Sequence, residues 1–87
     1  MARSICFVPD AWDGYHYWQS QDKKTLRRIN LLIEAAAPEP FAGIGKSEAL
    51  RGDLSGYWSR RIDESNRLVY RATDTELVIV ACRYHYV

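Results

Sequence analysis

The chain has 87 residues, of which 47% are hydrophobic and 26% charged, and its formal net charge is +1. This length predicts a single domain over residues 1–87 with one core, and the composition excludes a disordered chain. The near-neutral charge excludes a general electrostatic footprint for nucleic acid, and no apolar run approaches the roughly 18 residues of a membrane span, so we expect a cytoplasmic protein without a membrane partner.

The first part of the chain predicts a strand and a helix. Residues 3–8 have the character of a short strand, Pro9 stops it, and Asp10 is a candidate N-cap for the helix that follows. Gly14 weakens the helical pattern. Aromatic residues recur at every third position, which predicts an apolar stripe on this helix: Trp12, Tyr15 and Trp18.

A second helix follows at once. Asp22 is positioned to cap it, and Pro38 and Pro40 end it. One face is apolar and the other basic, and the apolar face consists of Leu26, Ile29, Leu32, Ile33 and Ala36. The two helices are therefore expected to form a hairpin.

The C-terminal half predicts a loop and then a series of strands. Residues 41–52 contain three glycines and are expected to be largely loop, and three apolar runs follow at 57–62, 67–72 and 77–84. Short polar connections join these runs, which favours adjacent antiparallel hairpins. The expected fold is α+β with the order βααβββ: a two-helix hairpin packed on one face of a small antiparallel sheet.

The two cysteines, Cys6 and Cys82, both lie in apolar strand-like runs and are expected to be buried thiols. A disulfide between them is a minor alternative in a reducing compartment. With only two histidines beside them, and no ligand spacing, the sequence predicts no metal site and no cofactor.

Charge is distributed unevenly in the C-terminal half. Acidic residues fall where turns are expected, whereas arginines fall in or beside the strands, at Arg60, Arg61, Arg67, Arg71 and Arg83. Any single arginine is most simply a solvated side chain. Five on three strands favour a surface that binds anions.

A carboxylate in the loop and an imidazole near the chain end add titratable groups to that surface. Glu48 is suited to remove the proton of a ribose 2′-hydroxyl, and His85 is suited to protonate the departing 5′-oxygen, because an imidazole titrates near neutrality. Arginines would stabilise the extra charge on phosphorus, and Tyr84 or Tyr86 would stack on a base. These residue types fit RNA cleavage without a metal.

Several motifs in order resemble the YoeB family of bacterial toxins, in the RelE/ParE superfamily. They are G-K-S-E-A-L, L-S-G-Y-W-S-R-R-I, N-R-L-V-Y and A-C-R-Y-H-Y, at residues 45–50, 54–62, 66–70 and 81–86. Upstream, W-D-G-Y-H-Y-W-Q, D-K-K and P-F-A-G-I-G-K extend the likeness over nearly the whole chain.

This resemblance implies a ribosome-dependent endoribonuclease that cleaves mRNA in the A site and is neutralised by a YefM-type protein antitoxin, with a homodimer as one of its forms. It places the general base on Glu48, the phosphate-stabilising arginine on Arg67 and the general acid on His85. An essential aromatic falls on Tyr86, and basic contacts to the substrate fall on two further positions, Arg51 and Arg61.

Three features depart from the family pattern. Asn66 stands where relatives often carry histidine, Ser47 and Ala49 flank Glu48 where prolines are common, and Val87 extends past the usual terminal tyrosine. None of these changes removes a group with an expected catalytic role.

The strand register is uncertain from the sequence. A symmetric four-residue turn at 63–66 would pair Ile62 with Arg67 and place Arg60 on the face of Arg67. Bringing Arg61 beside Arg67 requires an offset of one residue, such as a bulge.

Two alternatives from other classes remain open. One is a non-enzymatic relative of the ParE type that poisons gyrase, against which the joint presence of Glu48, Arg67 and His85 argues. The other is a toxin-fold module that acts only by binding an antitoxin.

Overall fold

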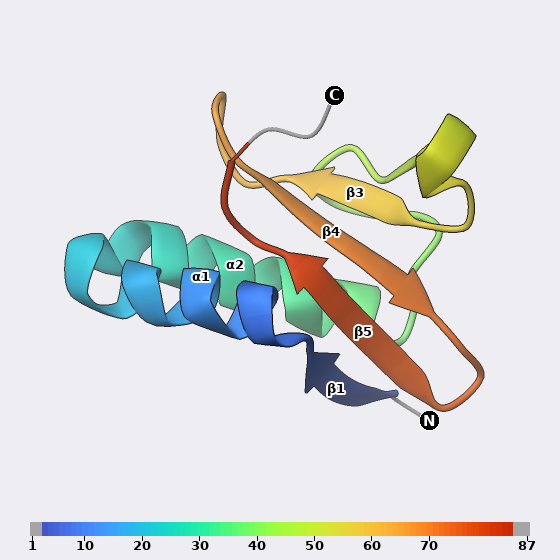
Figure 1. Cartoon of the computed structure of the whole chain (residues 1–87), viewed down its shortest axis with the longest axis horizontal. Helices are drawn as coiled ribbons and strands as arrows, with labels where there is room; N and C mark the ends of the chain where they lie inside the picture. Colours follow the sequence, from blue (N-terminus) through green and yellow to red (C-terminus); the bar gives the residue numbers. More distant parts are fainter. Residues whose placement is uncertain (1–2, 85–87) are drawn as a thin grey trace.

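In the computed structural model, which describes residues 3–84, two helices pack on one face of a five-stranded sheet (Figure 1). The helices are α1 (Pro9–Gln21) and α2 (Lys23–Ala36). The strands are β1 (Ser4–Phe7), β2 (Glu48–Ala49), β3 (Trp58–Arg61), β4 (Arg67–Ala72) and β5 (Glu76–Ala81). The α+β class and the helical hairpin on one face of the sheet are confirmed. None of the described helices has the length and apolar character needed to cross a membrane.

The sheet differs from the predicted one in two respects. Its strand order is β1-β5-β4-β3-β2, so a two-residue strand, β2, forms inside the segment 41–52 that was predicted to be largely loop. The backbone N–H of Leu50 donates to the carbonyl of Tyr57 at 2.9 Å, which closes the β2–β3 turn and aligns β2 with β3. The edge strand β1 pairs with β5 in parallel, because the long intervening chain permits a crossover that short hairpins do not.

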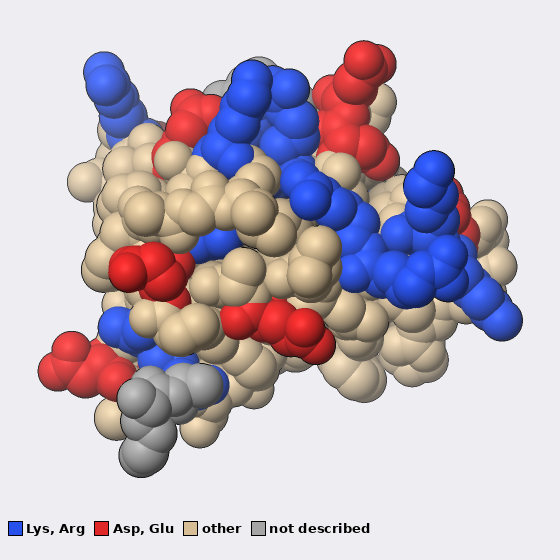
Figure 2. All heavy atoms as spheres, turned by 180° about the vertical axis from the view of Figure 1, so that it is seen from behind, with Lys and Arg blue, Asp and Glu red and all other residues tan. Residues whose placement is uncertain are grey.

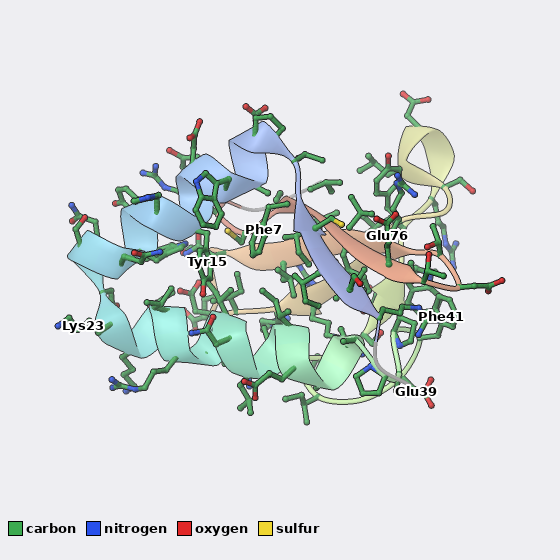
Figure 3. The ribbon with its side chains drawn as sticks, turned by 90° about the horizontal axis from the view of Figure 1, so that it is seen from below. Phe7, Tyr15, Lys23, Glu39, Phe41 and Glu76 are labelled. Carbon is green, nitrogen blue, oxygen red and sulfur yellow. The ribbon has the colours of Figure 1, made fainter. Side chains whose placement is uncertain are left out.

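The core lies between the helices and the sheet. α2 contributes Ile29, Leu32 and Ile33, and the sheet contributes Leu68, Tyr70, Leu77 and Ile79. Cys82 is also buried there, and burial raises the pKa of its thiol to about 11. At the edge of this core, Phe7 of β1 and Tyr15 of α1 approach one another with ring centroids 5.0 Å apart (Figure 3).

The helix boundaries follow proline and capping chemistry. α1 begins at Pro9 with Val8 as N-cap, so the prediction of Asp10 as N-cap is wrong: proline, which lacks an N–H, is favoured at the first helical position. Asp22 caps α2 as predicted, because its Oδ1 accepts the backbone N–H groups of Lys24 at 3.0 Å and Thr25 at 3.3 Å. Hydrogen bonds from the Thr25 hydroxyl and these backbone groups lower the pKa of Asp22.

Replacing Asp22 with alanine is expected to lower the midpoint of thermal unfolding by about 4 °C at pH 7, because two N–H groups of α2 lose their acceptor. The pKa of Asp22 is lower in the folded than in the unfolded chain. Its contribution to folding stability is therefore present above the unfolded pKa of about 3.9 and is lost as the pH falls through the folded pKa. Calorimetry at pH 7 and at strongly acidic pH should therefore show a difference from the parent only at pH 7. The exposed Asp13 of α1, changed to alanine, is the control.

The segment after β5 packs against α1. Nε1 of Trp18 donates to the carbonyl of Cys82 at 2.9 Å. Gly14 of α1 faces the same segment, because a Cβ at this position would come within 3.3 Å of the Cys82 sulfur. Gly14, which weakened the predicted helix, is therefore the residue that lets the chain end approach α1 closely.

Candidate active site

The candidate site lies on the face of the sheet turned away from the helices. Leu68 and Tyr70, which alternate with Arg67 and Val69 along β4, belong to the core under the helices, so Arg67 points to the opposite face. Arg61 is directly opposite Arg67 in the β3–β4 pair. Glu48 is directly opposite Ser59 in the β2–β3 pair. Side chains of directly opposed residues share a face, so β2, β3 and β4 present their polar groups together.

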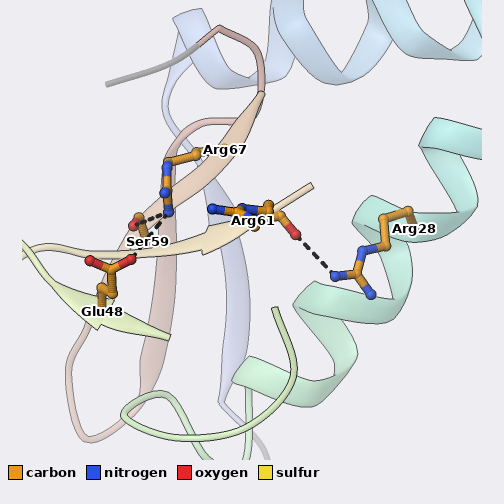
Figure 4. A network of polar contacts seen from close by, with 5 residues as sticks. All are labelled: Arg28, Glu48, Ser59, Arg61 and Arg67. Carbon is orange, nitrogen blue, oxygen red and sulfur yellow. Dashed lines mark hydrogen bonds and ion pairs between the residues drawn. The ribbon is translucent and has the colours of Figure 1, made fainter. Parts of the chain in front are cut away.

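Glu48 and Arg67 meet on this face (Figure 4). Nη1 of Arg67 lies 3.6 Å from Oε1 of Glu48 and donates to the Ser59 hydroxyl at 3.3 Å. The Arg67 side chain is 15% exposed, whereas that of Glu48 is 58% exposed. The guanidinium is thus held in place, and the carboxylate beside it remains open to solvent and to a ligand.

The register places Arg61 next to Arg67 through the turn rather than through a bulge in β3. The backbone N–H of Ile62 donates to the carbonyl of Asn66 at 3.0 Å, which leaves a connection of three residues, 63–65. The Cα partners are therefore Arg61 and Arg67, as the family resemblance required. A register shift does occur, but it lies between β4 and β5, at Val69 and Tyr70.

Arg60 is not the solvated side chain expected of a single strand arginine but is fully buried. Its Nε donates to the Tyr70 hydroxyl at 2.9 Å, and its Nη atoms donate to backbone carbonyls of the loop before β2 at 2.7–3.2 Å, those of Glu39, Ala42 and Ile44. Hydrogen bonds to these carbonyls replace the bonds to water that the guanidinium loses on burial. It thereby ties down the loop that leads to Glu48.

The chain end reaches the same site. The backbone N–H of Arg67 donates to the carbonyl of Tyr84 at 3.0 Å, so Tyr84 lies beside the candidate phosphate-binding arginine. His85 and Tyr86, on which the family resemblance places the general acid and the essential aromatic, lie outside the described residues. His85 follows Tyr84 by one peptide bond.

Basic side chains extend beyond the strands. Nη2 of Arg28, on α2, donates to the carbonyl of Arg61 at 3.1 Å and so links the helix to the site (Figure 4). Figure 2 shows Lys and Arg side chains gathered into a band on one face of a chain whose net charge is only +1. Arg51 is exposed in the turn between β2 and β3, and within residues 3–84 no hydrogen bond or ion pair joins its side chain to Glu48 or Arg67.

The groups that meet here are suited to acid–base chemistry on an anion. A carboxylate that can accept a proton lies beside a guanidinium that can bind a phosphate oxygen. Within residues 3–84, no three side chains of His, Cys, Asp or Glu come together as a metal site would require. The roles of Ser59 and Arg60 were not predicted from the sequence, because neither a serine nor an arginine indicates a positioning role until its neighbours in the fold are known.

Comparison with known proteins identifies relatives along nearly the whole chain. Residues 7–86 match the family described as YoeB-like toxin of bacterial type II toxin–antitoxin systems. Toxin YoeB of Mycobacterium bovis is 56% identical over 84 residues, which covers 97% of this chain and 99% of that toxin.

Solved structures agree with this likeness. The YoeB dimer from Staphylococcus aureus superposes with a TM-score of 0.91 at 41% identity, covering 99% of this chain and 100% of that one. The heterotetrameric YoeB–YefM toxin–antitoxin complex from the same organism gives a TM-score of 0.89, also at 41% identity and with the same coverage.

Proposed function

Because the chain belongs to the YoeB-like toxin family of bacterial type II toxin–antitoxin systems, we propose that it is a ribosome-dependent endoribonuclease that cleaves mRNA in the ribosomal A site. The observation that carries this proposal is the pairing of Glu48 with Arg67 on the open face of the sheet. A base and an anion-binding group adjoin there, and the backbone of Arg67 is hydrogen-bonded to Tyr84, the residue that precedes His85 in the sequence.

In the proposed reaction, Glu48 takes the proton of the ribose 2′-hydroxyl as its oxygen attacks the adjacent phosphorus. Arg67 binds the phosphoryl oxygens, whose negative charge grows in the transition state. His85 gives its proton to the departing 5′-oxygen. The products are a 2′,3′-cyclic phosphate and a 5′-hydroxyl. No step requires a metal ion or a cofactor.

The remaining site residues would hold the RNA. Arg51 and Arg61 are both exposed and would contact phosphates on either side of the cleaved bond. Tyr86 would stack on a base. General acid and general base catalysis each supply about 10²–10⁴-fold. Much of the acceleration therefore has to come from positioning and from the arginines.

We also propose that the chain binds a YefM-type antitoxin and forms a homodimer. Support comes from the S. aureus relatives, one of which is a YoeB–YefM heterotetramer and the other a YoeB dimer. The proposed site of action is the cytoplasm, where translating ribosomes provide the substrate.

A cell-free translation reaction tests this function. Purified toxin is expected to stop protein synthesis and to leave mRNA cut at the codon in the A site, as mapped by primer extension. Addition of the cognate antitoxin should prevent both effects. Full inhibition with intact message would contradict the proposal and favour a non-catalytic member of the superfamily, and a gyrase supercoiling assay would then test the ParE-type alternative.

A further inference from the structure

Both backbone groups of Tyr84 are held by two consecutive residues, Asn66 just before β4 and Arg67 at its start. The N–H of Tyr84 donates to Oδ1 of Asn66 at 2.7 Å, and the carbonyl of Tyr84 accepts the N–H of Arg67 at 3.0 Å. The second bond is a main-chain contact that any residue at position 67 other than proline could make. The first depends on the side chain of Asn66.

The backbone conformation at Tyr84 requires such support. Its φ is 69°, in the left-handed region, which residues with a Cβ seldom adopt. A conformation of this kind persists only where the surroundings impose it. The two hydrogen bonds from residues 66 and 67 supply that constraint.

The Asn66 amide is itself oriented. Its Nδ2 donates to Oδ1 and Oδ2 of Asp63 at 3.1 and 3.2 Å. Because a carboxylate only accepts hydrogen bonds, the NH₂ group must face Asp63, which turns the amide oxygen toward Tyr84. Asp63 is fixed in turn, since its Oδ1 accepts the backbone N–H groups of Ser65 and Asn66 at 2.8 Å each.

The other side of the segment rests on α1. The guanidinium carbon of Arg83 lies 3.5 Å from the ring centroid of Tyr17 and 4.5 Å from that of Tyr84. These contacts are favourable cation–π arrangements. Residues 83 and 84 therefore lie between α1 and the β3–β4 turn, with Asn66 as the side-chain anchor on the turn.

We propose that Asn66 is a positioning residue of the RNA-cleavage site, which fixes the main chain of Tyr84 and so sets the point from which His85 reaches the scissile phosphate. The inference rests on the proposed function of His85 as general acid. Asn66 then has a role in the site, although its residue type departs from the family pattern.

The test compares three chains in single-turnover cleavage of mRNA on preassembled ribosomes. Asn66→Ala is expected to lower the maximal rate by about 10- to 100-fold with an unchanged half-saturating toxin concentration, because a catalytic group is displaced while the substrate contacts remain. Asn66→His should stay close to the parent rate. An imidazole can accept the Tyr84 N–H at one nitrogen and donate to Asp63 from the other. Ser65→Ala, in the same turn, is the matched control.

A double-mutant cycle separates positioning from a general structural effect. If Asn66 acts through His85, Asn66→Ala should cause no further loss in a His85→Ala background. If Asn66→Ala lowers the cleavage rate in the His85→Ala background by the same factor as in the parent, the proposal is overturned. A parent-like rate for Asn66→Ala alone would also overturn it.

Hydrogen exchange of the Tyr84 amide, followed by NMR, is independent of catalysis. Protection is expected in the parent and in Asn66→His, and it should be lost in Asn66→Ala without a change in the core amides. If the Tyr84 amide stays protected in Asn66→Ala, Asn66 does not anchor Tyr84 and the proposal is overturned. A parent chain that leaves mRNA intact would overturn the proposed function, and the positioning role with it, even if this amide behaves as expected.

Discussion

Replacing Glu48 with glutamine should reduce the rate of mRNA cleavage by about 10²–10⁴-fold, the usual contribution of a general base. Glutamine keeps the size of the side chain and an oxygen near Arg67, but it cannot accept the 2′-hydroxyl proton. Because the Glu48 side chain is 58% exposed, the fold should be retained. The measurement is single-turnover cleavage on programmed ribosomes, with circular dichroism to verify folding.

The control for Glu48→Gln is Glu64→Gln, which makes the same charge change at an exposed position in the β3–β4 turn. It should cleave at the parent rate. Toxin–ribosome binding should be nearly equal in the two variants, so the difference is expected in the chemical step. If Glu48→Gln cleaves mRNA at a rate within a few-fold of the parent rate, another group must be the general base.

Replacing His85 with alanine should have an effect of the same order, about 10²–10⁴-fold, because the 5′-oxygen would then depart without a proton. The loss should depend on the leaving group. An mRNA on programmed ribosomes that carries a better leaving group in place of the 5′-oxygen at the scissile bond needs no general acid, so His85→Ala should cleave it nearly as fast as the parent does.

Glu48→Gln, in contrast, should remain defective on that activated substrate, since the attacking hydroxyl still needs a base. The pair of variants therefore distinguishes the two roles. His16→Ala is the control, because His16 is the other histidine and lies exposed on α1 in a T-shaped contact with Trp12. Equal loss for His85→Ala on both substrates would show that His85 is not the acid.

Local patterns in the sequence predicted the elements that depend on near neighbours. The apolar face of α2 and its Asp22 cap are encoded within a few residues, and both appear as predicted. The hairpins after β3 and β4 follow from apolar runs separated by short polar turns. The register was decided by the hydrogen bond from the Ile62 N–H to the Asn66 carbonyl, which depends on turn geometry that residue types alone do not specify.

Features that depend on contacts between distant segments were not predictable. Arg60 reads as a surface cation, and its burial becomes favourable only where loop carbonyls and the Tyr70 hydroxyl converge on it. The proximity of Glu48 to Arg67 came from the family resemblance, because β2 is too short to be recognised by periodicity. The anchoring of Tyr84 by Asn66 joins residues 18 apart in the chain and has no sequence signature.

The chemical identity of the new RNA ends is the most direct test of the proposed Glu48–Arg67–His85 mechanism. The 5′ fragment should end in a 2′,3′-cyclic phosphate, or in the phosphate left by its hydrolysis, and the 3′ fragment should begin with a hydroxyl that polynucleotide kinase labels without prior dephosphorylation. A 3′-hydroxyl paired with a 5′-phosphate would mean that water, not the ribose, attacked phosphorus, and would contradict the mechanism.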